Sequence, residues 1–182
     1  MNYHNITHDD MLNGSGLRVV LWVSGCSHHC KGCQNPQTWN PKSGILFDEN
    51  VKEELFTELS KDYISGITFS GGDPLYIENV PEVLELIKEI KEKYPTKTIW
   101  LYSGYTWEQI MQIEFSNSDL VPNYETIYDY RKEIIELCDV FVDGEYVEDK
   151  RDVSLKWCGS SNQRIIDVQK SIKKCNIILY SE

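Results

Sequence analysis

Short apolar runs alternate along this 182-residue chain with segments whose apolar residues recur at helical spacing. The first run, residues 17–23, is rich in β-branched residues and shows little alternation, which is typical of a strand buried on both faces of a sheet. Helical spacing instead indicates one buried helix face. The predicted strands cover residues 17–23, 66–70, 98–102, 139–142 and 164–168. The predicted helices cover residues 51–59, 80–94, 106–113 and 125–137, with a helical turn at 170–174.

Capping and helix-breaking residues mark the ends of these helices. Asp48 precedes the first helix and Thr106 a later one, and both side chains are suited to accept a hydrogen bond from a free backbone N–H. Pro81 is favoured in the first turn of the second helix. The Tyr94-Pro95 step ends that helix, because a residue before proline avoids helical geometry.

Two segments lack either pattern. Residues 1–16 are polar and end in Asn-Gly-Ser-Gly, so they predict a turn-rich entry to the first strand. Residues 114–124 hold Pro122 and predict a loop or an insertion. Elsewhere strands and helices alternate, which indicates repeated βα units, a largely parallel sheet and the α/β class. We expect one domain over residues 1–182.

Three cysteines crowd into the segment SGCSHHCKGCQN at residues 24–35. Cys26, Cys30 and Cys33 form a C-x3-C-x2-C pattern directly after the first predicted strand. Thiolates are soft ligands that select zinc, copper(I) or iron–sulfur clusters. A closed structural site takes four protein ligands, whereas a working centre keeps one position open. Three ligands therefore favour a cubane cluster with one iron left free to bind a substrate.

A structural zinc site is the main alternative. Its fourth ligand would come from His28, His29, Cys158 or Cys175, none of which lies in a second tight pair such as C-x2-C. Ligand count and softness favour iron–sulfur over zinc, and both histidines are expected to be polar loop residues. The cysteines at 138, 158 and 175 are scattered and are expected to be small buried hydrophobes outside any disulfide.

Composition limits the partners and the location. Lys and Arg number 18 against 29 Asp and Glu, and the net charge of −11 argues against a nucleic-acid partner. The longest apolar run, residues 19–23, is too short to span a bilayer. The polar start of the chain has no signal-peptide pattern. We therefore expect a cytoplasmic protein, in a compartment where thiols stay reduced.

A glycine pair follows the next predicted strand. Gly71-Gly72-Asp73-Pro74 is on its own a common strand-ending turn. Paired glycines also let the backbone approach a ligand closely. Functional groups of α/β proteins gather beyond the carboxyl ends of the strands. The turn gains significance because the preceding strand ends in the three-cysteine segment.

Together these segments resemble the radical S-adenosylmethionine (SAM) superfamily. SGCSHHCKGCQNPQTW, residues 24–39, is similar to its cluster loop, and SGGDPL, residues 70–75, to the stretch that holds the methionine part of SAM. The resemblance is strongest to activating enzymes of glycyl radical enzymes, in the branch acting on the anaerobic ribonucleoside-triphosphate reductase. Supporting segments are MNYH (1–4), NGSG (13–16), SGYTW (103–107), VDG (142–144) and GSSNQRIID (159–167).

The resemblance implies a fold and a metal centre. The fold is a radical SAM-type partial (open) β/α barrel with a largely parallel sheet, and the chain is shorter than the ~250 residues of a closed eight-fold barrel. The centre is a 4Fe-4S cluster ligated by Cys26, Cys30 and Cys33, with no catalytic residue beyond these ligands. An open barrel would let a glycine loop of a partner reach the radical.

SAM is the second implied cofactor. Its contacts would come from Gly32, Cys33, Gln34 and Gly72, while Asp73 would either bind the SAM amino group or cap its turn. Reductive cleavage of SAM would yield a 5′-deoxyadenosyl radical that generates a glycyl radical on the glycyl radical subunit of the reductase. The implied partners are that reductase and an electron donor such as flavodoxin or a thiol system, with no nucleic acid and no membrane.

Two other classes of function remain. A small radical SAM enzyme acting on a free metabolite would cleave SAM without any reductase. A zinc-stabilised interaction domain would bind zinc and would not cleave SAM. Two features depart from the family pattern: residues 114–133 look longer than in the shortest members, and Cys158 stands where a basic residue is expected.

Overall fold

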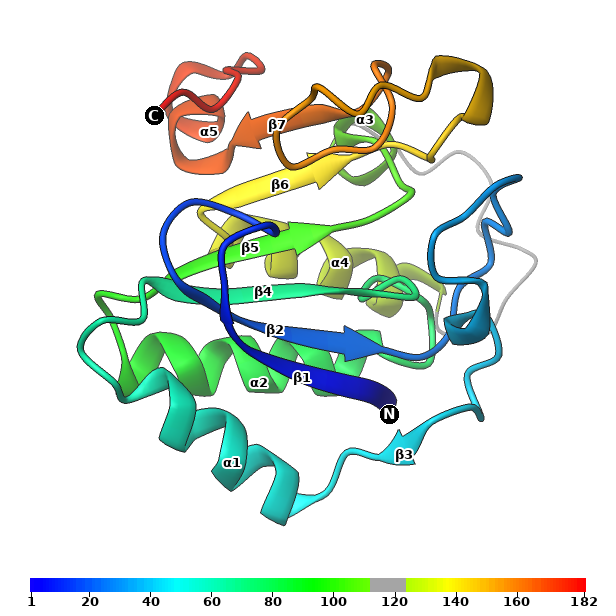
Figure 1. Cartoon of the computed structure of the whole chain (residues 1–182). Coiled ribbons are helices and arrows are strands. Elements are labelled where there is room, and N and C mark those ends of the chain that lie inside the picture. The colour runs from blue at the N-terminus through cyan, green and yellow to red at the C-terminus, as the bar shows by residue number, and fades with distance from the viewer. Residues whose placement is uncertain (112–123) are drawn as a thin grey trace.

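The computed structural model describes residues 1–111 and 124–182, which form one seven-stranded mixed sheet with helices packed on it (Figure 1). The strands are β1 (Asn2–Asp10), β2 (Arg18–Val23), β3 (Ile45–Leu46), β4 (Gly66–Gly71), β5 (Thr98–Tyr102), β6 (Val140–Asp143) and β7 (Arg164–Asp167). Their order across the sheet is β3-β1-β2-β4-β5-β6-β7. The central strands β2, β4, β5 and β6 are parallel, and β1, β3 and β7 pair antiparallel. In the described residues β3 does not pair with β7, so the sheet is open. The predicted α/β class and mostly parallel sheet are confirmed.

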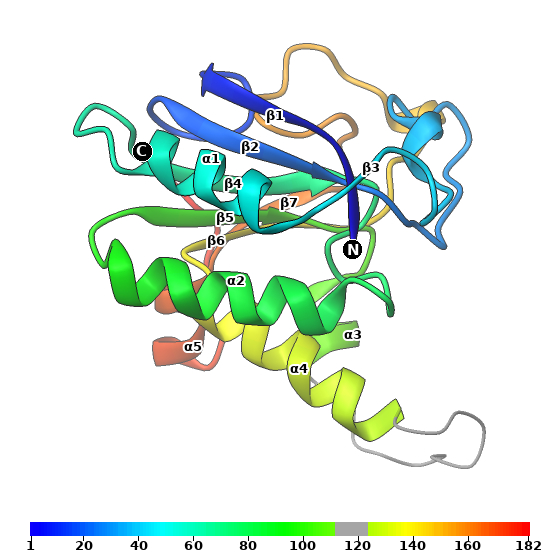
Figure 2. The same ribbon diagram turned by 90° about the horizontal axis from the view of Figure 1, so that it is seen from below.

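Helices pack on one face of this sheet. They are α1 (Glu49–Leu59), α2 (Val80–Lys93), α3 (Trp107–Met111), α4 (Tyr124–Leu137) and α5 (Val168–Lys174), with short 3-10 turns at Pro36–Thr38 and Glu148–Lys150. Figure 2 shows α2, α4 and α5 on the same side of the strands. In the described part of the chain no helix is long and apolar enough to cross a bilayer.

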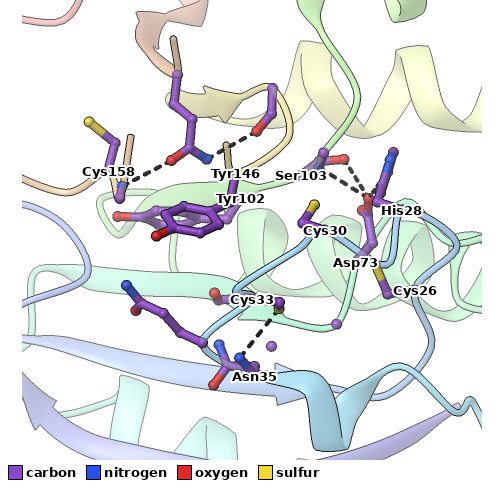
Figure 3. A pocket seen from close by; sticks show the side chains of 18 of the residues that line it. Cys26, His28, Cys30, Cys33, Asn35, Asp73, Tyr102, Ser103, Tyr146 and Cys158 are labelled. Atoms are coloured by element: carbon purple, nitrogen blue, oxygen red, sulfur yellow. Dashed lines mark hydrogen bonds and ion pairs between the residues drawn. The ribbon is translucent and has the colours of Figure 1, made fainter. Parts of the chain in front are cut away.

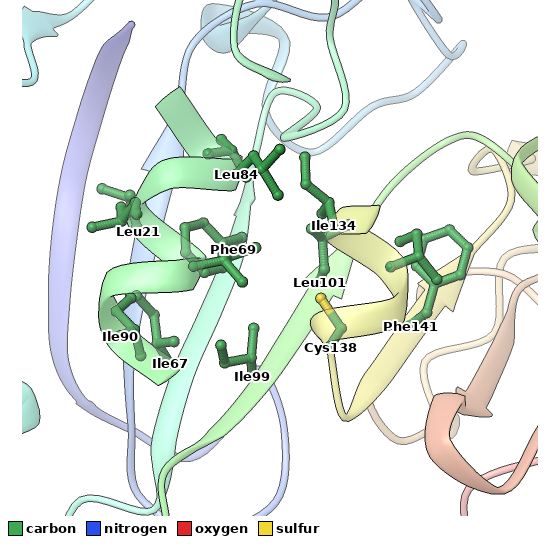
Figure 4. Packing of buried hydrophobic residues seen from close by; sticks show 14 of the residues in the cluster. Leu21, Ile67, Phe69, Leu84, Ile90, Ile99, Leu101, Ile134, Cys138 and Phe141 are labelled. Atoms are coloured by element: carbon green, nitrogen blue, oxygen red, sulfur yellow. The ribbon is translucent and has the colours of Figure 1, made fainter. Parts of the chain in front are cut away.

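Side chains on the helix-facing side of the strands form the main core. Leu21 of β2, Phe69 of β4 and Leu101 of β5 are fully buried there. They pack with Leu84 of α2 and Ile134 of α4 (Figure 4). Full burial of one such side chain contributes roughly 1.5–3 kcal/mol. This layer holds the parallel strands in register, so their carboxyl ends meet at one edge.

A buried arginine lies on the opposite face of the sheet. Arg18 donates hydrogen bonds to the hydroxyls of Thr68 and Thr98 at 2.8 and 2.9 Å, and to the carbonyls of Ile67 and Thr98 at 2.6 and 2.9 Å. Its guanidinium lies 5.3 Å from the ring centre of Trp100. Burial lowers the pKa of Arg18 to about 10. The arginine therefore joins three parallel strands from inside the fold.

The start of the chain differs from the prediction of a turn-rich entry. It forms β1, which pairs with β2 and β3. Irregular register between Tyr3 and Asn5 and between Thr7 and Asp10 breaks the two-residue alternation of this strand. Tyr3 and Ile6 pack on the core from positions that do not follow strand periodicity. The sequence pattern concealed the strand for this reason.

The predicted helix caps are present. The Asp48 carboxylate accepts a hydrogen bond from the Val51 N–H at 3.1 Å. Thr106 accepts from the Gln109 N–H at 3.3 Å, and Gln109 accepts from the Thr106 N–H at 2.8 Å, which forms a reciprocal capping box. The predicted end of this helix at residue 113 and nearly all of the predicted loop at 114–124 lie outside the described residues.

Candidate iron–sulfur site

The carboxyl ends of β2, β4, β5 and β6 meet at the edge drawn on the right of Figure 1. The cysteine loop, residues 24–35, leaves β2 at this edge. The Gly72 N–H donates to the Val23 carbonyl at 2.8 Å, and the Asp73 N–H donates to the Gly25 carbonyl at 2.7 Å. A Cβ at Gly72 would collide with that Gly25 carbonyl. The two predicted functional segments therefore lie side by side, and glycine is needed where they touch.

A cavity of about 460 Å³ opens at this edge. Cys26, Cys30 and Cys33 all line it, and Tyr102 and Cys158 lie across the cavity from Cys26 (Figure 3). The structure therefore brings the three predicted ligands to one cavity. All six cysteines of the chain are free thiols.

Three of the four predicted SAM contacts line the same cavity: Cys33, Gln34 and Gly72. Gly32 does not belong to the lining. It turns the loop with a φ of 75°, and a Cβ there would collide with the Glu148 carboxylate. In the structure, the missing side chain of Gly32 therefore leaves room for the Glu148 carboxylate.

Burial dominates the electrostatics of two of the thiols. It raises the pKa of Cys26 to about 11 and also raises the pKa of Cys30, because a thiolate is poorly solvated inside the cavity. Metal ligation requires the thiolate, so metal binding at this site must release protons. The cavity favours neutral thiols until a soft cation compensates the buried charge.

Backbone N–H groups affect all three thiols. The Asn35 N–H donates to the Cys33 sulfur at 3.4 Å. The backbone of His28 and His29 favours the charged form of Cys26, and that of Tyr146 favours the charged form of Cys30, although burial has the larger effect on both pKa values. Such N–H···S contacts tune the reduction potential of an iron–sulfur cluster.

Asp73 caps its turn and joins neighbouring loops. One carboxylate oxygen accepts from the Leu75 N–H at 2.8 Å. The other accepts from His28 Nε2 at 2.8 Å, the Ser103 hydroxyl at 2.9 Å and the Gly104 N–H at 3.2 Å. The side chain is 1% exposed. Of the two roles considered for Asp73, the structure supports capping, because both oxygens are occupied by protein donors.

His28 is a functional neighbour that sequence reasoning missed. Its Nε2 faces Asp73, and its Nδ1 faces the Glu145 carboxylate at 2.9 Å. The ring also lies edge-to-face with Tyr105 at 4.7 Å. Burial opposes the charge on His28, but the hydrogen bonds to both carboxylates outweigh it and raise its pKa. The sequence signal that could have identified His28 was its position between the predicted ligands Cys26 and Cys30.

The zinc alternative finds no complete ligand set. Both nitrogens of His28 are engaged, His29 is exposed beside Trp39, and Cys175 is exposed at the end of α5. Of the proposed fourth ligands, His28 and Cys158 line the cavity, and the two nitrogens of His28 already face carboxylates. Across the described residues, no group of three or more His, Cys, Asp or Glu side chains is arranged around a single ion. Thiolates on a cubane bind different irons, so they need not converge on one point.

Two buried polar atoms in the cavity wall are unpaired. Trp39 Nε1 and the Tyr102 hydroxyl have no hydrogen-bond partner among the described residues. Both residues line the cavity with the three cysteines. Unpaired buried donors are costly, and those in natural proteins commonly mark a missing ligand or water. The wall therefore fits a polar ligand placed beside a thiolate-bound cluster.

Three thiols at the carboxyl edge of an open, mostly parallel sheet are typical of an α/β iron–sulfur protein. A family model described as a 4Fe-4S single cluster domain matches residues 12–166. Curated relatives named anaerobic ribonucleoside-triphosphate reductase-activating protein are similar over most of the chain. The relative from Enterobacteria phage T4 is 42% identical over 165 residues, covering 91% of this chain and 93% of its own. Those of Escherichia coli K12 and Vibrio cholerae are 38% and 36% identical, covering 90% and 91% of this chain and 96% and 97% of their own. The chain belongs to the family of anaerobic ribonucleoside-triphosphate reductase-activating proteins.

Proposed function

We propose that this chain is a radical SAM activating enzyme that generates a glycyl radical on the anaerobic ribonucleoside-triphosphate reductase. One observation carries the proposal. Cys26, Cys30 and Cys33 line the same cavity as Gly72, at the carboxyl edge of the parallel strands. Three thiols suit a cluster with one open iron, and the neighbouring glycine turn suits a ligand bound at that iron.

Cys26, Cys30 and Cys33 would hold a 4Fe-4S cluster. When bound, the cluster supplies one electron that cleaves SAM to methionine and a 5′-deoxyadenosyl radical, which takes a hydrogen atom from a glycine of the reductase. The protein contributes ligation, orientation and exclusion of water. No acid or base of the chain is needed for this chemistry.

The cavity residues would orient SAM. Gly72 would present backbone to its methionine end, and Cys33 and Gln34 would line its path in the same cavity. The unpaired Trp39 Nε1 and Tyr102 hydroxyl are available as hydrogen-bond donors to SAM or to the peptide that enters with it. Gly32 would contribute only by shaping the cysteine loop.

The open sheet supports a partial β/α barrel with an accessible cavity. Because β3 and β7 remain apart, a glycine-bearing loop of the reductase would enter without passing through a closed barrel. The partner follows from the family to which the chain belongs. Reduced thiols are required for ligation, so we place the reaction in a reducing compartment such as the cytoplasm, with flavodoxin or a thiol system as electron donor.

Electron spin resonance of the anaerobically reconstituted protein tests this function. The protein is given iron and sulfide, then a reductant, SAM and the reductase. We expect a glycyl radical doublet that requires all components, together with 5′-deoxyadenosine release. SAM consumption without a doublet would favour an enzyme acting on a free metabolite. Bound zinc with no cluster and no SAM cleavage would favour the interaction domain.

A further inference from the structure

The segment that follows β6, residues 145–148, contacts the cysteine loop at successive points. Glu145 accepts a hydrogen bond of 2.9 Å from His28, two residues after the first cysteine. The next residue, Tyr146, lines the same cavity as Cys30. Segment 145–148 thus reaches the residue midway between two predicted ligands, although it is remote from them in sequence.

A second contact lies further along the cysteine loop, at Gly32. The Glu148 carboxylate occupies the space that a side chain at position 32 would need, and Gly32 leaves that space free. Glu148 is held there by the Tyr146 hydroxyl, which donates to it at 2.6 Å. The segment therefore contacts the cysteine loop at more than one point along its length.

His28 transmits this contact to the rest of the strand edge. Its second nitrogen is bonded to the buried Asp73, which also accepts from Ser103 and Gly104. A Cβ at Gly104 would lie 2.5 Å from the His28 ring, so the imidazole is packed tightly against the loop after β5. The His28 side chain is 10% exposed. One imidazole thus connects the cysteine loop with the loops after β4, β5 and β6.

We propose that segment 145–148 positions the cysteine loop through His28. The proposal rests only on contacts within the chain. Glu145 and His28 are positioning residues, because the bonds of His28 to Glu145 and Asp73 fix the loop that carries the cysteines.

Hydrogen exchange of the iron-free protein tests this positioning role. Glu145→Gln removes one charge from the ion pair, and Asp149→Asn is its matched control, since the exposed Asp149 carboxylate has no bonded partner in the described residues. We expect amides of residues 26–34 to exchange two- to fivefold faster in Glu145→Gln, the range of a partly exposed ion pair. His28→Ala should accelerate them by about tenfold or more, because both hydrogen bonds are lost.

A conservative variant separates positioning from general damage. His28→Gln keeps an amide donor for Asp73, so it should restore part of the protection lost in His28→Ala. Asp149→Asn should exchange like the wild type. Exchange of residues 26–34 that is equal in Glu145→Gln, His28→Ala, Asp149→Asn and the wild type would overturn the positioning role.

Failure of the reconstituted wild-type protein to assemble any cluster would count against the proposed function, and the exchange result would still decide the positioning role.

Discussion

The side-chain amide of Asn79 donates hydrogen bonds to the carbonyl of Ser24 at 2.7 Å and to that of Asp73 at 3.1 Å. Asn79 precedes α2 and is 2% exposed. It occupies the capping position but makes no side-chain bond to its own helix. One buried amide therefore joins the start of the cysteine loop, the glycine turn and α2.

Asn79→Ala should lower the free energy of unfolding by about 1–3 kcal/mol, because two buried carbonyls lose their donor. Urea denaturation measures the change. Asn50→Ala is the control, since Asn50 is exposed on α1 and should change stability by no more than about 0.5 kcal/mol. Equal stability of the two variants would contradict a structural role for the Asn79 amide.

Arg18→Leu should destabilise the fold by about 3 kcal/mol or more, because the carbonyls of Ile67 and Thr98 lose buried, charge-assisted hydrogen bonds. Arg18→Lys should restore little of this loss. A single ammonium cannot bond at once to all the hydroxyls and carbonyls that the planar guanidinium of Arg18 reaches. Chemical denaturation of both variants checks the prediction. Wild-type stability in Arg18→Lys would show that only the charge matters at this position.

The Glu108–Arg164 pair should make stability depend on acid pH. Arg164 donates to both Glu108 oxygens at 2.9 and 2.7 Å, and this lowers the pKa of Glu108 to about 2 from its ordinary 4.5. The folded pKa lies below the unfolded one, so the contribution is complete above about pH 4.5 and is lost as the pH falls toward 2. Glu108 is 43% exposed, so solvent screening limits the contribution to about 1 kcal/mol.

Denaturation of the wild type and Glu108→Gln between pH 6 and pH 3 measures this contribution. The difference in unfolding free energy between the two proteins should shrink as the pH falls. A difference that stays constant over that range would show that the carboxylate charge does not stabilise the fold.

Cys26 of the iron-free protein should react slowly with iodoacetamide. Its pKa of about 11 lies two units above the ordinary 9.0, so the thiolate fraction near neutral pH is about 100-fold smaller. The alkylation rate, followed by mass spectrometry, should rise with pH until about pH 11. A midpoint near pH 9 would mean that burial does not suppress ionisation of this thiol.

Replacing Cys26, Cys30 or Cys33 by Ala should abolish stable cluster assembly and the glycyl radical, because each removes an anionic ligand. Cys175→Ala should leave both unchanged, since Cys175 lies exposed at the end of α5. Iron and sulfide analysis measures cluster assembly, and electron spin resonance measures the glycyl radical. Full activity in Cys30→Ala would refute the assigned ligand set.

Local patterns predicted much of the secondary structure. The apolar runs became β2, β4, β5, β6 and β7, and the caps at Asp48 and Thr106 form as expected. These features depend on neighbouring residues in the chain, so periodicity and side-chain type suffice to find them. The strand β1 was not predicted, because two register irregularities in this polar segment disturb the same periodicity.

The sequence by itself determined the alternation of strands and helices, and it placed three soft ligands after one strand and a glycine pair after the next. Only the tertiary structure decided that Asp73 bonds to His28, that Glu145 reaches the same imidazole, and that Tyr146 lines the same cavity as Cys30. These contacts join loops after different strands. Their geometry depends on how the parallel strands align against the helix layer, and a pattern of neighbouring residues does not contain that alignment.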